Sequence, residues 1–142
     1  MSAFLVFIQF LSIFLMFLPL SESVSFYFFG IFFIVLGLIV GALGIKAHPS
    51  DNFNIRPNIK DSCVLITSGI YRSIRHPMYF SVIVSMFGVL LLKFSLLESI
   101  IYVVLFINMI VKMFYEESLW HCQRDEYKEY AKKTKRLIPY VF

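Results

Sequence analysis

The stretch "SFYFFGIFFIVLGLIVGALGI", Ser25 to Ile45, runs without a single charged side chain. At ~1.5 Å per residue, a helix of this length matches the ~30 Å hydrocarbon core of a lipid bilayer. The whole chain is 59% hydrophobic and only 15% charged, whereas a soluble domain usually has about 25% charged residues. The sequence therefore predicts an integral membrane protein, and its 142 residues allow one domain.

Three further apolar stretches accompany this one, namely Ala3–Leu20, Met78–Leu92 and Leu96–Tyr115. In the first, Gln9 and Ser12 are the only strongly polar side chains. Met78–Leu92 is short for a complete span, and we expect Lys93 at its end to extend to the membrane interface. The pattern predicts an all-α polytopic membrane protein with about four transmembrane helices. Its last two form a hairpin over residues 77–115, and the fourth continues as a helix through the tail, residues 116–135.

Glycines recur at a helical spacing within the second apolar stretch. Gly37 and Gly41 form a GxxxG step, and Gly44 lies near the same side of the predicted helix. Two interpretations stand. Small residues allow two membrane helices to approach closely, but glycine is also common in membrane helices in general.

Basic residues indicate how the chain is oriented in the membrane. No Lys or Arg precedes Lys46, five lie between Lys46 and Arg75, and six lie between Arg124 and Arg136. Cytoplasmic segments carry an excess of Lys and Arg, so we expect both segments and both termini to face the cytoplasm. We expect the run Lys132–Arg136 to meet anionic lipid headgroups rather than nucleic acid.

Polar side chains are dense where the third apolar stretch begins, in "GIYRSIRHPMYF", Gly69 to Phe80. Pro77 suits the first position of a helix, because its missing N–H would have no partner there. An antiparallel hairpin brings this region to the end of the fourth stretch. One site would then gather Tyr71, Arg72, Arg75, His76, Tyr79, Lys112, Glu116 and Glu117.

These residue types suit a ligand with several chemical parts. The N-terminus of a helix favours an anion such as a carboxylate, and Arg75 could add a charge-assisted hydrogen bond. Glu116 or Glu117 could accept hydrogen bonds from a ribose diol or face a cation, while Tyr71 and Tyr79 could stack on an aromatic base. S-adenosylmethionine contains all of these parts.

Other interpretations of the cluster start from the same residues. Basic and aromatic side chains at the mouth of a membrane helix are commonly interface anchors. A metal site is not predicted, because no second histidine lies at metal-ligand spacing from His76. Cys63 and Cys122 are far apart and lack metal spacing, which favours two free thiols.

Three motifs in a fixed order carry a family resemblance. They are "LITSGIYRSIRHPMY" (Leu65–Tyr79), "EESL" (Glu116–Leu119) and "EYKEYAKKTKRLIPY" (Glu126–Tyr140). The set resembles the isoprenylcysteine carboxyl methyltransferase family, which is related to the membrane phospholipid methyltransferases, over roughly Asn52 to Tyr140. The resemblance implies an integral-membrane enzyme that uses S-adenosylmethionine. The chain would be one methyltransferase domain, with two N-terminal transmembrane helices (1–45) and a catalytic region with a cytosolic cofactor-binding lobe and C-terminal helix (46–142).

The resemblance also implies roles for individual residues. Arg75, Lys112 and Glu116 would be catalytic, and Lys112 would handle the carboxylate of the acceptor with the charge of an arginine but without its planar fork. Upstream, Arg56 or Asn58 would add to the cofactor contacts. The main cofactor contacts would be Leu65, Ile66, Thr67, Ser68, Gly69, Ile70, Tyr71, His76, Pro77, Met78, Tyr79, Glu116 and Glu117.

The acceptor stays open between two chemistries. A carboxylate on a lipidic or prenylated molecule calls for a nearby cation, here Lys112. An amine on a phospholipid headgroup calls for a base or carboxylate, such as Glu117. A third interpretation is a non-catalytic membrane packing protein, which would tolerate changes at His76 and Glu116.

Overall fold

The computed structural model describes residues 2–18, 20, 25–47, 65–123 and 125–138. Within these ranges the regular structure is helical, and no strand occurs. The elements are α1 (Ser2–Phe17), α2 (Tyr27–Lys46), the 3₁₀ helix η2 (Gly69–Arg72), α3 (Pro77–Leu92), α4 (Leu96–Gln123) and α5 (Asp125–Lys133). The prediction of an all-α protein is confirmed for the described part of the chain.

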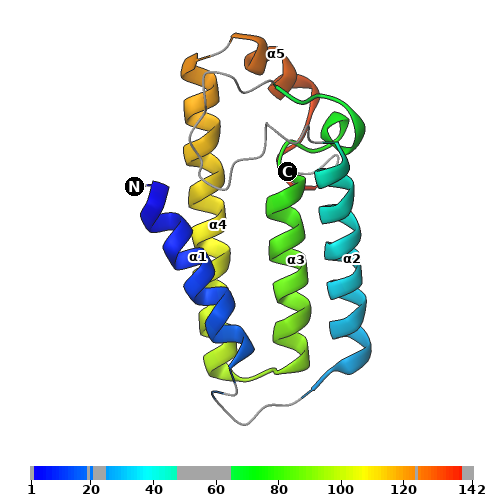
Figure 1. The fold of residues 1–142 in the computed structure, drawn as a ribbon, viewed down its shortest axis with the longest axis vertical. Helices are drawn as coiled ribbons and strands as arrows, with labels where there is room; N and C mark the ends of the chain where they lie inside the picture. The colour runs from blue at the N-terminus through cyan, green and yellow to red at the C-terminus, as the bar shows by residue number, and fades with distance from the viewer. Residues whose placement is uncertain (1, 19, 21–24, 48–64, 124, 139–142) are drawn as a thin grey trace.

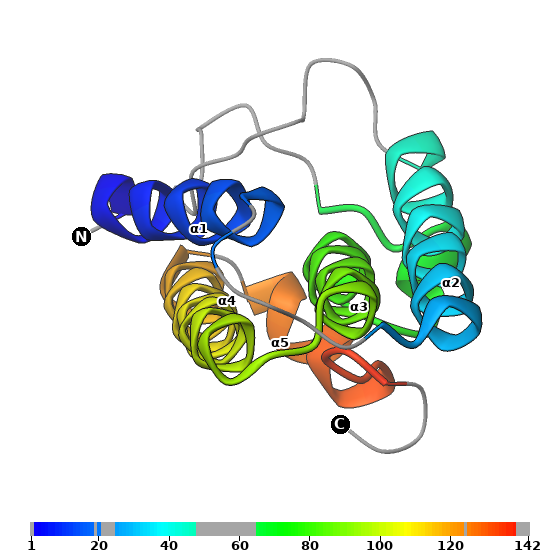
Figure 2. The same ribbon diagram turned by 90° about the horizontal axis from the view of Figure 1, so that it is seen from below.

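The four long helices lie side by side as an up-and-down bundle (Figure 1). α3 packs against α2 on one side and α4 on the other, and α1 packs mainly on α4 (Figure 2). α3 begins at the end of the bundle where α4 finishes, and α5 lies at this same end (Figure 1). The predicted hairpin therefore forms, and it places the polar stretch before Pro77 beside the end of α4.

Among the described residues, two helices are long and apolar enough to cross a membrane. These are α2 and the Leu96–Trp120 part of α4. α1 and α3 have 16 residues each, which gives about 24 Å at ~1.5 Å per residue. Large apolar side chains such as Phe7, Phe28 and Ile107 are exposed on the outside of the bundle, as expected for a surface that faces lipid. That the two shorter helices also cross stays a prediction.

Glycines bring α2 and α3 into close contact. The buried residues of α2 are Gly30, Gly37, Gly41 and Gly44. A Cβ added at Gly30 would lie 2.9 Å from the carbonyl oxygen of Gly88 on α3, and one added at Gly88 would lie 2.5 Å from that of Gly30. Backbones this close leave no room for a side chain, so the interpretation of helix packing is confirmed.

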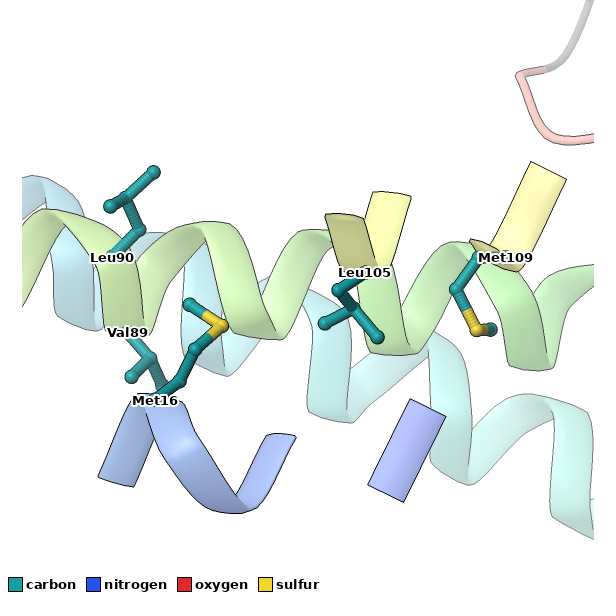
Figure 3. Packing of buried hydrophobic residues seen from close by; sticks show 5 residues of the cluster. All are labelled: Met16, Val89, Leu90, Leu105 and Met109. Carbon is teal, nitrogen blue, oxygen red and sulfur yellow. The ribbon is translucent and has the colours of Figure 1, made fainter. Parts of the chain in front are cut away.

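The apolar core lies where α1, α3 and α4 meet. It consists of Met16 from α1, Val89 and Leu90 from α3, and Leu105 and Met109 from α4 (Figure 3). Met16 and Leu105 are completely buried. This cluster attaches α1 to the hairpin near the end opposite to α5.

Lys93 follows α3 and binds the end of α1; that it lies at the membrane interface stays a prediction. Its ammonium donates hydrogen bonds to the carbonyl oxygens of Met16 (3.0 Å) and Leu18 (2.5 Å), and it lies 3.2 Å from the carboxylate of Glu98. The last carbonyls of a helix have no partner within the helix. The Lys93 ammonium therefore supplies hydrogen bonds to carbonyl oxygens at the end of α1.

The tail is not one continuous helix, which corrects the prediction for residues 116–135. α4 ends at Gln123 and α5 begins at Asp125. The ring of Tyr127 stacks on that of Trp120 with 5.8 Å between centroids, so α5 folds against α4. The chain then returns to the start of α3, where Ile74 and Lys135 form an isolated parallel bridge.

Candidate functional site

The first turn of α3 offers two backbone donors. Pro77 is its first residue, and the preceding His76 makes no side-chain capping hydrogen bond. The N–H of Phe80 bonds to the carbonyl of His76 (3.1 Å), whereas the N–H groups of Met78 and Tyr79 belong to the first turn, which has no intrahelical acceptor. These donors and the positive end of the helix dipole suit an anion.

The segment that leads into α3 is held by the tail. The N–H groups of Arg75 and His76 donate to the carbonyls of Lys135 (2.7 Å) and Arg136 (3.0 Å). The Tyr130 hydroxyl donates to the carbonyl of Tyr71 (2.6 Å). Burial raises the pKa of Tyr130 to about 12, so its hydroxyl keeps this proton even in moderately alkaline solution. Positioning of His76 therefore depends on the C-terminal part of the chain.

Glu117 is enclosed by three nitrogen-bearing side chains. Arg75 Nε donates to Oε1 at 2.9 Å, and Arg136 Nε donates to Oε2 at 2.8 Å. His76 Nε2 lies 3.3 Å from Oε1. The Glu117 side chain is 4% exposed, so its charge is buried but paired, as a buried carboxylate requires.

Arg75 has further partners in the tail. Its NH1 donates to the carbonyl oxygens of Ala131 (2.9 Å) and Thr134 (2.5 Å). The guanidinium thus links α4, the end of α5 and the residues before α3. The role of Arg75 in contacting a bound ligand stays a prediction. Its observed contacts are internal ones, with Glu117, Ala131 and Thr134.

Glu116 has a different environment from its neighbour. The Tyr79 hydroxyl donates to its Oε2 at 2.7 Å, and the ring of His76 lies edge-on to that of Tyr79 at 5.2 Å. Within the part of the chain that the structure describes, Oε1 of Glu116 has no hydrogen-bond partner. This oxygen can accept hydrogen bonds from a ligand near the start of α3.

Lys112 lies deeper in the bundle, where it joins its own helix to two others. It belongs to α4, its Nζ donates to Oε1 of Gln9 on α1 at 2.8 Å, and it lies 5.5 Å from the ring centroid of Tyr79 on α3. The residue is 4% exposed. Tyr79 therefore has Glu116 at its hydroxyl and Lys112 over its ring, which joins the two predicted catalytic positions in one site.

The remaining predicted residues lie before α3. Leu65–Ser68 lead into η2, and Thr67, Ser68 and Gly69 are exposed. Gly69 has a φ of +59°, a conformation that glycine adopts most readily. The role of these residues in cofactor binding stays a prediction. Arg56, Asn58 and Cys63 lie outside the described residues.

Sequence reasoning missed two residues of the site. Gln9 was noted only as polar in an apolar stretch, although a buried amide needs a partner, and this could have indicated one. Arg136 was assigned to lipid headgroups with the rest of its basic run. Instead it binds Glu117, and its guanidinium lies 5.0 Å from the ring centroid of Phe114, which corrects that expectation for this residue.

The donor set fits S-adenosylmethionine better than it fits a metal. Backbone donors at Met78 and Tyr79 suit a carboxylate, and the open oxygen of Glu116 suits a ribose hydroxyl or a cationic centre. Among the described residues, no group of three or more His, Cys, Asp or Glu side chains is arranged to hold a metal ion.

Comparison with known proteins identifies the family. The family model for phospholipid methyltransferase matches residues 25–123, a range that includes α2, α3 and α4 but neither Gln9 nor Arg136. Searches of curated proteins and of solved structures found no match. Since the matched range covers more than half of the 142 residues, the chain belongs to the phospholipid methyltransferase family, a family of integral-membrane methyltransferases.

Proposed function

We propose that this protein transfers a methyl group from S-adenosylmethionine to a carboxylate on a lipidic or prenylated acceptor. Family membership supplies the reaction type. The choice of a carboxylate rests on one observation, which is the difference in pairing between Lys112 and Glu117.

The charges in the site favour an anionic acceptor. Both oxygens of Glu117 are occupied by arginines, so this carboxylate is not available to attract an amine. Lys112 is buried and has a neutral amide, that of Gln9, as its hydrogen-bond acceptor. Glu116 on the same helix attracts this ammonium, but its carboxylate bonds to Tyr79, and a buried ammonium gains further from a negatively charged ligand.

The residues divide into two groups by the part of the reaction that they serve. The start of α3 and Glu116 would hold the cofactor, and the Tyr79 hydroxyl would fix the orientation of Glu116 through their hydrogen bond. Lys112 would hold one oxygen of the acceptor carboxylate on the other side of Tyr79. We propose that the acceptor reaches Lys112 from the lipid between helices and that the cofactor enters from the cytoplasm.

The chemistry asks little of the protein beyond alignment. S-adenosylmethionine supplies a methyl group on a positively charged sulfur. A carboxylate is already ionised at neutral pH, so no side chain has to remove a proton from it. Holding two reactants in line is one of the largest contributions that a protein can make to such a displacement. The buried site also favours a reaction in which opposite charges are neutralised.

Methylation of a phospholipid amine is the second candidate. The family description favours it, and Oε1 of Glu116 could then face the amine in place of a ribose hydroxyl. The two candidates differ in their products, because a methyl ester is cleaved by mild base and a methylamine is not.

Product analysis tests the proposal. The purified protein in nanodiscs is given methyl-labelled S-adenosylmethionine with either a prenylated cysteine or phosphatidylethanolamine. We expect base-labile label on the prenylated cysteine and its loss in Lys112→Met. Base-stable label on phosphatidylethanolamine alone would instead support the amine candidate, and absence of label on both would contradict methyl transfer to either acceptor.

A further inference from the structure

We propose that Gln9 is a positioning residue that makes the site selective for carboxylates, so that α1 takes part in acceptor recognition. This inference rests on the proposed function and deepens it. α1 lies entirely before the matched range 25–123, so membership in the family assigns it no role in the reaction.

The contact that carries the proposal is buried and polar. The Gln9 amide oxygen accepts a hydrogen bond from Lys112 Nζ at 2.8 Å, and the two residues are 8% and 4% exposed. A lysine side chain is long and flexible, and its ammonium otherwise moves toward water. Gln9 fixes the ammonium inside the bundle, near the ring of Tyr79.

The neutrality of Gln9 matters as much as its position. A glutamate here would form an ion pair with Lys112 and cancel its charge, whereas an amide satisfies one N–H and leaves the positive charge in place. Glu116, four residues further along α4, already attracts the Lys112 ammonium, while its carboxylate accepts a hydrogen bond from Tyr79. Because Gln9 adds no second negative charge, Lys112 keeps its attraction for the carboxylate of the acceptor.

The attachment of α1 to the bundle does not depend on Gln9 alone. The side-chain amide of Asn108 on α4 donates to the carbonyl of Leu5 at 3.0 Å, and Met16 packs in the core with Val89 and Leu105. A change at Gln9 therefore leaves other α1 contacts in place. Asn108 supplies a matched control, because its side chain also joins α1 to α4 but bonds to the carbonyl of Leu5 and not to the Lys112 ammonium.

Gln9→Glu separates the two roles that this contact could have. It retains an oxygen that can accept from Lys112, so a purely structural role for Gln9 predicts normal activity. If Gln9 preserves the charge of Lys112, we expect the KM for the prenylated cysteine to rise by at least about tenfold. Binding of S-adenosylhomocysteine should change by less than about twofold. Gln9→Met, which keeps the charge but releases the ammonium, should also raise this KM.

The experiment measures both quantities by methyl-ester formation and by calorimetry in nanodiscs, for wild type, both Gln9 variants and Asn108→Leu. Asn108→Leu should leave the KM near that of wild type. A wild-type KM in Gln9→Glu overturns the inference while the proposed function stands. An equal rise of KM in Asn108→Leu also overturns it, since α1 docking would then explain both. If wild type makes no methyl ester, the proposed function fails, and the inference fails with it.

Discussion

Glu116 and Glu117 are neighbours in the sequence, but their side chains have different partners. Successive residues of an α-helix point about 100° apart, since it has ~3.6 residues per turn. Glu117 therefore faces Arg75, His76 and Arg136, whereas Glu116 faces Tyr79. Glu117 is therefore held by internal contacts, and we propose that Glu116 binds a ligand.

The difference predicts which glutamate binds the cofactor. We expect Glu116→Gln to weaken S-adenosylhomocysteine binding by at least about tenfold, because an amide accepts fewer hydrogen bonds and carries no charge. Calorimetric titration in nanodiscs measures the affinity. Glu126→Gln, at an exposed position on α5, is the control and should bind as wild type. Equal affinity in Glu116→Gln and wild type would contradict the assignment.

Arg136 should contribute more to the free energy of unfolding than an exposed arginine does. Arg136→Met removes a hydrogen bond between charged groups and leaves Oε2 of Glu117 without it, so we expect a loss of about 1.5–3 kcal/mol in the free energy of unfolding. Arg72→Met is the control, because Arg72 is exposed. Denaturant unfolding in mixed micelles compares the two variants. A loss no larger than that of the control would mean that the contact with Glu117 adds little.

At the scale of helices, the approach of α2 to α3 depends on how much space each glycine leaves. At Gly88, a methyl group would meet the backbone oxygen of Gly30 at 2.5 Å, which cannot move without shifting α2. At Gly44, it would meet the sulfur of Met78 at 3.0 Å, and a methionine side chain adapts easily.

The same substitution at these two positions should therefore have different effects. Gly88→Ala should cost about 1–3 kcal/mol or more, as overpacking does, and Gly44→Ala should have a much smaller effect. Unfolding free energies of the two variants, measured under one set of conditions, provide the comparison. Similar losses of unfolding free energy at both positions would contradict this difference between Gly88 and Gly44.

Local patterns in the sequence were enough to predict most of these elements. Apolar runs gave α2, α3 and the membrane part of α4, and Pro77 was correctly expected to begin α3. The break after Gln123 was missed because residues 116–135 are rich in helix-forming residues. α5 folds against α4, where Tyr127 stacks on Trp120, and such tertiary contacts leave no local signal.

For the whole molecule, the lengths of the helices set how the bundle can sit in a bilayer. α4 is long enough to cross, whereas α3 has 16 residues. The basic residues lie mainly at the end that holds the site, and we expect this end to face the cytoplasm. The turn between α3 and α4 would then lie near the opposite surface.

Cysteine labelling in intact cells tests this orientation. After Cys63 and Cys122 are replaced, Leu96→Cys should react with an impermeant thiol reagent from outside, because α4 begins there. Lys133→Cys should react only after the cells are opened. Protection of Leu96→Cys in both conditions would mean that the α3–α4 hairpin does not reach the far surface.

The candidate site was only partly foreseeable from the sequence. The hairpin and the family resemblance place His76, Tyr79, Glu116 and Glu117 together, and their contacts agree with this. The partners from distant parts of the chain were not foreseen. Gln9 and Arg136 join the site through tertiary contacts across α1 and the tail, and a single sequence cannot reveal such pairs.

The site takes its contacts from almost the full length of the chain, and this has a consequence for biosynthesis. Gln9 leaves the ribosome long before Lys135 and Arg136, which bond to the residues before α3. A nascent chain can insert its apolar helices while these residues are still inside the ribosome. The enclosure of Glu117 can form only after Arg136 has left the ribosome, so the site is completed after the apolar helices have entered the membrane, not during entry.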